Sequence, residues 1–566
     1  MNKNLISACL GFVALSKSLS GGTEPFSEWA EQQVKAARSG TVSVISLEKG
    51  TYHVKAYECG ARLLHLSNND DGVKHILFDL SGLENVVVEG NGAELILHGR
   101  VIPFFIKGSE NITIRNLTID WANPFFGQGE VCGVGKGWFE VQFEDDYPVE
   151  VRDGSLYFLN PDLPDPITFC NINFFDRARE DLVFQSWDEY GVARSYKALD
   201  KGKNRVRIVS RKIRSPIKVG HVAVFQYAGR AAPALAVQRS KGIHLENLTQ
   251  YHAAAIANLF EGSTDIYIDN LQVVRRPHSG RFYSTHHDAT HFVDCRGDIF
   301  LRNSRIEFQG DDSCNIHGVF RTVYANPRPN VLRTKLNHFQ QIGLDTLYPG
   351  DLVGFHDALT LEYLGEGRLS KVTRLNPQDF EMVFEKPLPD INWTRAVLAL
   401  RPENVHVDIS GNSFSRHRAR GLLIKTLGKV RIHDNYFHVQ GAAIKIRNEA
   451  SSWYEAGPVD DVEIYNNVFD QCNTGGFSRA TFEIDPTLED TSSEAPVFRN
   501  IRIHNNRIIQ IFKPLLIANN VEGLEFYDNE IVAGEDYELW YKRPGNPGDY
   551  LFGKGVTKGK FQLDDR

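Results

Sequence analysis

One short pattern recurs ten times along the chain: two apolar residues separated by a single position, then an asparagine and another apolar residue. The copies begin at Val86, Ile112, Ile243, Ile266, Ile299, Val407, Val430, Val462, Ile501 and Leu524. In seven of the nine steps, successive copies lie 23 to 39 residues apart. A repeat of this length matches one turn of a parallel β-helix, where each coil buries its apolar face only against its neighbours. The sequence therefore predicts an all-β fold, a right-handed parallel β-helix.

The recurrent asparagine indicates a tight turn in each coil. Asparagine tolerates the left-handed backbone region, and its amide can hydrogen-bond to the same residue one coil away. A β-sandwich with asparagine-rich hairpins is the alternative, but hairpins favour two-residue Asn-Gly turns at a shorter spacing. We therefore expect asparagines to stack along the β-helix.

Two long steps interrupt the repeat, at residues 122–235 and 319–402. Each is too long for a loop and contains its own strand-like runs. The run KVGHVAVF in the first resembles YPGDLVGF in the second, so both segments are predicted to be small antiparallel β-barrels inserted between coils. The β-helix is then divided into an N-terminal part at 21–121, with an amphipathic capping helix at 27–38, central coils at 236–318 and C-terminal coils at 403–566.

The first 20 residues have the layout of a secretory signal peptide, with Lys3, an apolar run from Leu5 to Leu15 and a cleavage site near Ser20. This predicts a secreted, periplasmic or cell-surface protein. The net charge of −8 offers no basic surface for nucleic acid, and no later run of 18 apolar residues predicts a membrane span. The six cysteines beyond the signal peptide have irregular spacing and no CxxC pair, which predicts neither a disulfide framework nor a zinc site.

The candidate chemistry lies between residues 286 and 318, which contain Asp288 and the pair Asp311-Asp312. Because Asp288 and Asp312 are 24 residues apart, a coil of that length stacks them on adjacent parallel strands, about 4.8 Å apart. Stacked carboxylates repel, so at least one pKa should be raised. Glycoside hydrolysis uses such a set, because it needs a protonated acid together with an ionised base. We therefore predict Asp288, Asp311 and Asp312 as the catalytic residues.

Basic and aromatic residues are expected beside the acids. Aligning the coils by their repeats places Leu423 in register with Asp312, and Lys425 and Lys445 two positions further along the same face. The predicted substrate-binding residues are His287, His317, Lys425, Lys445, Arg447 and Trp453, with Trp121 structural and Glu483 a weaker candidate for the groove. Trp453 could stack on a sugar or pack on the wall. Histidines 286, 287 and 291 could join the acids around a metal or grip sugar hydroxyls, and we predict no metal and no cofactor.

These motifs carry a family resemblance. The segment GDDSCNIHG, with an aspartate one coil upstream and RGLLIKT further on, resembles the polygalacturonase-type β-helix hydrolases of glycoside hydrolase family 28. The domain order and the 24-residue spacing of the acids make the chain more similar to glycoside hydrolase family 110, bacterial exo-α-1,3-galactosidases whose β-helix bears two inserted barrels.

The resemblance implies an inverting enzyme that removes terminal α-1,3-linked galactose, as on the blood group B antigen, with Asp311 as general acid and Asp288 and Asp312 as the base pair. Because Leu423 stands where the polygalacturonase motif has arginine, a neutral hexose is favoured over a uronic acid. The rival hypotheses are a polygalacturonase-like or sulfated-galactan hydrolase, a pectate-lyase-like enzyme and a non-catalytic polysaccharide-binding β-helix. Whether branched or linear galactosides are preferred, and the oligomeric state, stay open.

Overall fold

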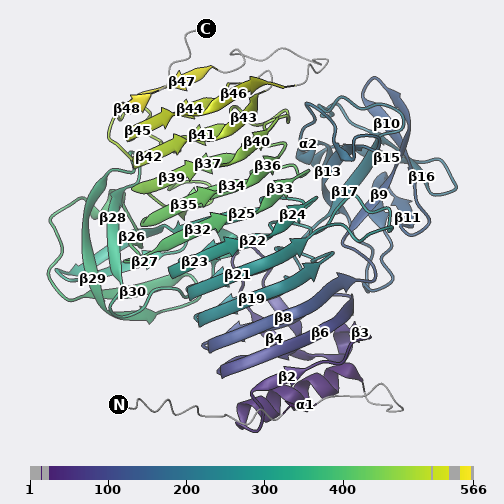
Figure 1. Cartoon of the computed structure of the whole chain (residues 1–566), viewed down its shortest axis with the longest axis horizontal. Helices are drawn as coiled ribbons and strands as arrows, with labels where there is room; N and C mark the ends of the chain where they lie inside the picture. Colours follow the sequence, from purple (N-terminus) through teal and green to yellow (C-terminus); the bar gives the residue numbers. More distant parts are fainter. Residues whose placement is uncertain (1–13, 16–24, 511–513, 535–548, 562–566) are drawn as a thin grey trace, which may run out of the picture.

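The computed structural model describes residues 14–15, 25–510, 514–534 and 549–561, and it confirms the parallel β-helix (Figure 1). Two long sheets run along the coil, and the strands of successive coils pair in parallel. The larger, sheet A, comprises β1 (Ala14–Leu15), β2 (Val44–Ser46), β3 (Thr51–Lys55), β6 (Glu84–His98), β8 (Glu110–Trp121), β19 (Lys241–Gln250), β21 (Thr264–Val273), β23 (Arg296–Arg302), β24 (Arg305–Glu307), β32 (His406–Ser410), β33 (Ser413–Ser415), β35 (Lys429–His433), β36 (Tyr436–His438), β39 (Asp461–Tyr465), β40 (Val468–Asp470), β42 (Phe498–His504), β43 (Arg507–Gln510), β45 (Val521–Tyr527), β46 (Glu530–Ala533) and β48 (Val556–Phe561).

The second sheet, sheet B, carries the site described below. It comprises β4 (Gly60–Leu64), β5 (Gly72–Asp79), β7 (Val101–Lys107), β18 (Leu235–Gln238), β20 (Asn258–Glu261), β22 (Thr290–Val293), β25 (Cys314–Val319), β34 (Leu422–Lys425), β37 (Ile444–Ile446), β41 (Phe482–Ile484), β44 (Leu516–Ala518), β47 (Tyr550–Phe552) and the short β38 (Glu455–Ala456), which pairs with β25. Apart from β4 and β38, which pair antiparallel, its strands follow the coil in parallel.

Apolar side chains stack in the interior of the coil. In sheet A, Ile432 lies in register between Ile409 and Ile464, and the same column continues through Ile503 and Phe526. All five are buried, as the alternating pattern requires when one face of each strand points inward. This column is the physical basis of the sequence repeat.

The recurrent asparagines take two forms, and both stack. In the shorter copies the asparagine itself has positive φ, as at Asn247 and Asn270, and their side chains bond across coils at 3.0 Å. In the longer copies from Val407 onward the residue before it has positive φ, and the asparagine turns inward. Buried amides then form a continuous ladder through Asn412, Asn435, Asn467, Asn506 and Asn529, with Nδ2 to Oδ1 distances of 2.9 to 3.0 Å. The expected stacking of asparagines is confirmed.

The first insertion is a seven-stranded antiparallel sheet with a separate hairpin and a short helix. It comprises β9 (Phe126–Gly135), β10 (Trp138–Phe143), β11 (Val149–Arg152), β12 (Ser155–Phe158), β13 (Phe169–Asp176), β14 (Asp181–Leu182), α2 (Tyr190–Arg194), β15 (Lys197–Asp200), β16 (Arg205–Val209) and β17 (Val222–Tyr227). Buried aromatic rings, among them Phe143, Phe158 and Phe225, fill its interior.

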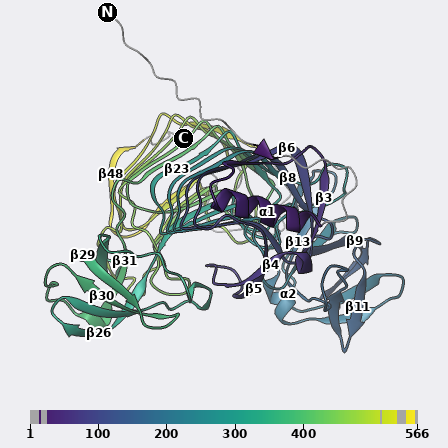
Figure 2. The same ribbon diagram turned by 90° about the horizontal axis from the view of Figure 1, so that it is seen from below.

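The second insertion is a closed antiparallel barrel of six strands. It comprises β26 (Arg321–Arg328), β27 (Val331–Lys335), β28 (Leu352–Asp357), β29 (Tyr363–Arg374), β30 (Asp379–Phe384) and β31 (Ala396–Leu400), with 3₁₀ turns at Phe339–Gln341 and Trp393–Arg395. Figure 2 shows that both insertions project from the same side of the coil. Sheet B therefore has an insertion on either flank.

The amphipathic helix α1 (Phe26–Arg38) lies at the first coils, packed against β2, β3 and β5 (Figure 1). Trp29 and Val34 on its inner face are buried, so it covers the N-terminal end of the coil. Ahead of it, the predicted signal peptide, residues 1–20, lies outside the described residues except for β1. A further 3₁₀ turn spans Ala56–Glu58.

Other sequence expectations concern cysteines, membrane spans and Trp121. The six described cysteines are free thiols. The described helices include none that is long and apolar enough to cross a membrane. Trp121 is fully buried and donates from Nε1 to the carbonyl of Gly99 at 2.9 Å, which confirms its structural role.

Candidate active site

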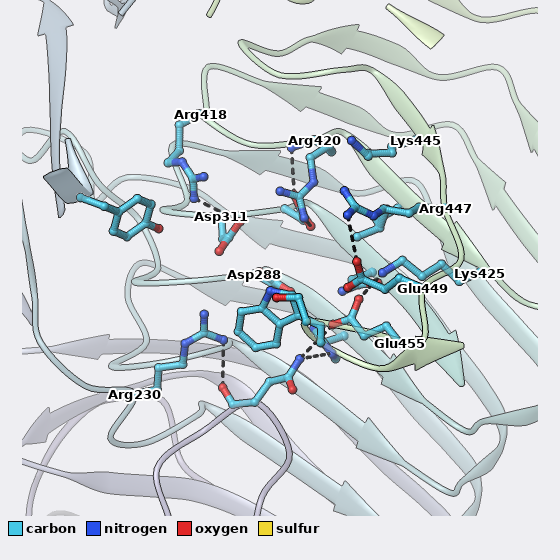
Figure 3. A pocket seen from close by; sticks show the side chains of 18 of the residues that line it. Arg230, Asp288, Asp311, Arg418, Arg420, Lys425, Lys445, Arg447, Glu449 and Glu455 are labelled. Atoms are coloured by element: carbon cyan, nitrogen blue, oxygen red, sulfur yellow. Dashed lines mark hydrogen bonds and ion pairs between the residues drawn. The ribbon is translucent and has the colours of Figure 1, made fainter. Parts of the chain in front are cut away.

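A cavity of about 510 Å³ opens over sheet B, with charged side chains on its floor (Figure 3). Coils of the β-helix supply the floor, and segments from other parts of the chain, among them helix α2, supply the walls. The lining residues are Asn68, Tyr190, Arg194, Arg230, Asp288, His291, Asp311, Asp312, Asn315, Arg418, Arg420, Leu423, Lys425, Lys445, Arg447, Glu449, Ser452, Trp453 and Glu455. All three predicted catalytic acids lie in this cavity.

The acids precede two neighbouring strands of sheet B. Thr290 pairs with Cys314, so Asp288 and Asp312 occupy equivalent positions on adjacent coils, as the 24-residue spacing predicted. One carboxylate oxygen from each of Asp288, Asp311 and Asp312 lies within 4.8 Å of the other two. Gly310 permits this approach, because a Cβ at that position would lie 2.2 Å from the carbonyl oxygen of His286.

Two arginines that the sequence analysis missed hold the acid pair. Arg420 donates to Asp312 from its backbone N–H at 2.9 Å and from Nη2 at 2.7 Å. Arg418 reaches Asp311 at 3.2 Å and also bonds to Asp188, beside α2 of the first insertion, at 2.5 Å. The available signal was RHRAR, which concentrates three arginines just before β34.

The predicted register beyond the acids is wrong. Cys314 pairs with Leu422, and Leu423 pairs with Lys445, so Arg420 rather than Leu423 occupies the position opposite Asp312. The expected register fails because the recurrent asparagine is not one structural position: Asn412 lies opposite Ser304, one place beyond Asn303. Counted from the paired residues Ile299 and Val407, the paired residues Cys314 and Leu422 both lie 15 positions further on. Leu423, which stands where the polygalacturonase motif has arginine, still lines the cavity, but Arg420 brings a guanidinium group beside the acids.

Near neutral pH the three acids are expected to hold at least one proton. Burial, together with the charge of Asp311, raises the pKa of Asp288 to about 8. Burial likewise raises the pKa of Asp312 to about 8, against the opposing effect of Arg420. Burial would also raise the pKa of Asp311, but the Arg418 and Arg420 guanidinium groups outweigh it and hold that pKa below its usual range. The expected pKa rise is present, and the two guanidinium groups favour an ionised Asp311.

The acids form the acidic half of the floor, meaning Asp288, Asp311 and Asp312 with Arg418 and Arg420. The basic half comprises Lys425, Lys445 and Arg447, each with its own carboxylate. Lys445 binds Glu483 at 2.6 Å, Arg447 binds Glu449 at 2.9 Å, and Lys425 contacts Glu455. Burial opposes ionisation of Glu483, yet Lys445 lowers its pKa to about 2. The expected contrast between an acidic centre and basic neighbours is present.

The predicted binding residues divide into two groups. Lys425, Lys445, Arg447 and Trp453 line the cavity, while His287 and His317 lie outside its lining. His287 Nδ1 contacts the Nδ1 of His286 at 2.7 Å, and Glu483 supports Lys445 from outside the lining. A direct sugar contact is therefore available to the first group only.

Trp453 is fixed in place by the second insertion. Its ring lies 4.2 Å from that of His338, centroid to centroid, and its carbonyl accepts from Gln341 Nε2 at 2.8 Å. On its other side, the Arg230 guanidinium lies 5.8 Å from the ring centroid. Trp453 therefore has both the exposure to the cavity and the support that a sugar platform requires.

Two clusters have the spacing of metal ligands, the three aspartates and the set His291, His317 and Glu455. Both already hold a protein cation, since Arg420 binds Asp312 and Lys425 contacts Glu455. A divalent ion in either cluster would meet that cation at contact distance. The donor sets therefore fit an internal ion-pair network better than a metal.

Comparison with known proteins identifies relatives. Family models match both insertions, GLAA-B beta-barrel domain I over residues 127–223 and GLAA-B beta-barrel domain II over 331–392. The chain is 30% identical to alpha-1,3-galactosidase A of Shewanella woodyi, over 86% of this chain and 80% of the relative. It is 28% identical to alpha-1,3-galactosidase B of Bacteroides thetaiotaomicron, over 94% and 89%.

Among solved structures, the A-module of the mannuronan C-5 epimerase AlgE6 from Azotobacter vinelandii superposes with a TM-score of 0.39 at 11% identity. That alignment covers 96% of this chain and 98% of the module.

Proposed function

The chain belongs to the α-1,3-galactosidases of glycoside hydrolase family 110, and on this basis we propose that it is an inverting exo-enzyme releasing terminal α-1,3-linked galactose from glycans such as the blood group B antigen. It is therefore a glycoside hydrolase acting on a sugar substrate. The observation that carries the proposal is the convergence of three carboxylates, two buried and one part-buried, on the floor of one cavity.

The proposed reaction divides two tasks among the acids. Asp311 donates a proton to the glycosidic oxygen as the bond to the anomeric carbon breaks. Asp312, with Asp288 beside it, orients a water molecule and accepts its proton as the water oxygen bonds to that carbon. One proton leaves the trio and one returns, so the acids hold the same number of protons before and after each turnover.

The resting electrostatics require the shared proton to move. The arginines favour an ionised Asp311, and the proton rests on Asp288 or Asp312. For Asp311 to act as the acid, the proton must shift onto it when the sugar binds and displaces water. The close approach of the three carboxylates supports such a transfer, because a single hydroxyl group hydrogen-bonded to two of them can bridge the distance between their oxygens.

The short distance between the carboxylates also bears on whether the enzyme inverts or retains the anomeric configuration. Inverting glycosidases commonly place their two carboxyl groups about 6.5 to 9.5 Å apart and retaining ones about 5 to 5.5 Å. Here the nearest oxygens approach within 4.8 Å. Two carboxylates beside the expected water position support inversion, since a retaining enzyme needs only one nucleophile. Proton NMR of the first galactose released should show the β-anomer, and α-galactose would show retention.

The substrate class is tested by release of sugar from four compounds: nitrophenyl α-galactoside, blood group B trisaccharide, linear α-1,3-galactobiose and polygalacturonate. We expect galactose from the trisaccharide or the galactobiose. Release of galacturonate instead would favour the polygalacturonase-like alternative, which gains weight from the arginines now placed beside the acids. A folded protein inactive on all four would favour a polysaccharide-binding role.

We also propose export through the signal peptide predicted at residues 1–20. The support is the basic, apolar and small-residue order of that segment. Expression of the full chain in a bacterium, followed by N-terminal sequencing of the periplasmic or secreted product, tests it. A mature N-terminus near residue 21 is expected, and an intact N-terminus in the cytoplasm would contradict export.

A further inference from the structure

A row of three hydrogen bonds leads away from Asp288 into the protein. His291 Nδ1 lies 2.6 Å from Asp288 Oδ2, and His291 Nε2 lies 2.9 Å from His317 Nε2. His317 Nδ1 in turn lies 2.7 Å from the carbonyl oxygen of Gly318. Both histidines are at least 98% buried, so their ring nitrogens have these partners in place of bulk water.

The partners determine where each proton sits. A carbonyl oxygen only accepts, so His317 Nδ1 must carry a hydrogen, and the Nε2 of a neutral His317 is then an acceptor. His291 Nε2 must donate to it. If His291 is also neutral, its Nδ1 is an acceptor, and the hydrogen in its 2.6 Å contact with Asp288 belongs to the carboxyl group.

Both histidines are neutral in this environment. Burial is the main cause that lowers the pKa of His291 to about 4 and of His317 to about 4. The charged groups facing them are Glu455, Lys425, Arg230 and Asp311, with Asp288 bonded to His291. Asn68 Nδ2 also lies 3.2 Å from His291 Nε2 and 3.5 Å from Glu455 Oε1, while its Oδ1 is buried without a partner. Turning the amide over would let Oδ1 accept from the His291 N–H at the cost of the long hydrogen bond to Glu455.

We propose that His317, acting through His291, is a positioning residue that holds the resting proton of the catalytic trio on Asp288. The proposal rests on the hydrolytic function proposed above and assigns a task to residues that do not reach the sugar. The carbonyl of Gly318 fixes the tautomer of His317, and His317 in turn fixes the tautomer of His291, whose Nδ1 can then only accept a hydrogen bond from Asp288. Each group donates to the next, from Asp288 through the two histidines to the backbone carbonyl.

This arrangement determines which of the three acids carries their shared proton. With Arg418 on Asp311 and Arg420 on Asp312, Asp288 is the member of the trio that contacts no guanidinium group in the described structure. The histidine row gives that carboxyl an acceptor for its hydrogen, so the proton that neutralises the trio has a defined resting place. A hydrogen bond to the neutral form of an acid favours that form.

The kinetic test uses His317→Leu and His317→Gln. In His317→Leu, His291 loses its acceptor and can turn to the Nδ1–H tautomer, which donates to ionised Asp288. The alkaline limb of the kcat/KM profile should then move down by about one pH unit. In His317→Gln, the side-chain oxygen can accept from His291 in place of the imidazole, so the limb should stay where the wild type has it. An unmoved limb in folded His317→Leu would overturn the proposal.

A matched control excludes a general effect of removing a buried imidazole. His356 is 4% exposed and lies in the second insertion, where its Nδ1 contacts the carbonyl of Leu361, and it does not line the active-site cavity. His356→Leu should leave the limb unchanged. A shift equal to that of His317→Leu would also overturn the proposal, because the effect would then not require the row.

A spectroscopic measurement keeps the inference separate from the hydrolytic function. Nitrogen-15 NMR of histidine-labelled full-length protein distinguishes the two neutral tautomers and the imidazolium, and the His291→Gln spectrum identifies one signal among the 19 histidines. At pH 7 we expect His291 as the Nε2–H tautomer, changing to Nδ1–H in His317→Leu. An Nδ1–H or imidazolium His291 in the wild type would overturn the proposal, whether or not galactose is released.

Discussion

The two halves of the cavity floor neutralise charge in opposite ways. In the basic half, each cation has a carboxylate of its own: Lys425 with Glu455, Lys445 with Glu483, and Arg447 with Glu449. In the acidic half, three aspartates meet two arginines, and one of these also binds Asp188. Each cation of the basic half is therefore neutralised by an ion pair, whereas the acidic half has more carboxylates than guanidinium groups and also holds a proton, which is the species that acid–base catalysis must move.

The largest expected effect comes from removing the acids. On a natural linkage, whose leaving group is poor, Asp311→Asn should lose about 10² to 10⁴-fold in kcat, the usual contribution of a positioned acid. An activated aryl galactoside should lose less. Asp288→Asn and Asp312→Asn should slow both substrates alike, because the water still needs its base. Steady-state kinetics on the two substrates checks this, and near-native rates for all three variants would refute the assignment.

Removing a cation from the basic half should lower the free energy of unfolding. Lys445→Met leaves Glu483 buried, 2% exposed, without its ammonium partner, which should cost about 3 to 5 kcal/mol. The matched double variant Lys445→Met/Glu483→Met removes both charges and should recover most of the loss. Urea unfolding of the two variants measures this. Equal destabilisation of both would mean that packing, and not the ion pair, is what the lysine provides.

The pH profile of kcat/KM should show at which pH the three acids lose their shared proton. Because burial raises the pKa of Asp288 and of Asp312 to about 8, the shared proton is lost above that pH. We expect a bell-shaped kcat/KM with an alkaline limb near pH 8 that falls about tenfold per pH unit, and the limb belongs to the trio as a unit. Activity that rises through pH 9 would show that the fully ionised trio is the active form.

Asp288→Asn should stabilise the protein near neutral pH. The folded-state pKa of Asp288 lies above its unfolded value, so the native state binds the extra proton between about pH 4 and pH 8, and its stability falls as the pH rises through that window. Asparagine does not ionise, so the variant lacks this loss of stability with rising pH. The window between the two pKa values corresponds to about 5 kcal/mol at pH 7.5, so we expect a gain of that order at pH 7.5 and none near pH 4. Urea unfolding at both pH values measures it, and a gain that is the same at both would contradict the linkage.

The smallest expected effect is that of metal removal. Lys425 and Arg420 occupy the positions beside both clusters of potential ligands, so we expect EDTA to leave kcat/KM unchanged. Activity assays before and after dialysis against the chelator check this. Loss of activity restored by calcium would revive the lyase-like hypothesis and would remove the distinction between the two halves.

The site was partly predictable because its acids lie close together in sequence. Asp288, Asp311 and Asp312 fall within one coil length, so spacing alone places them together. Arg230, Asn68 and Glu455 come from distant segments, and the sequence contains no periodic signal that links them to the acids. Arg420 was detectable as well, because it follows Val407 by the same 13 positions that separate Asp312 from Ile299, but aligning the coils on their asparagines hides this register.

The sequence by itself determined the β-helix, its asparagine ladders, its two interruptions and the stacking of the acids, because all of these follow from a repeat that each coil imposes on the next. Only the tertiary structure decided which cation faces which acid. Register after an insertion depends on turn lengths that differ from coil to coil, and one residue of slip exchanges inward and outward side chains. The protonation of the trio follows from those contacts and from burial, and both exist only in the folded chain.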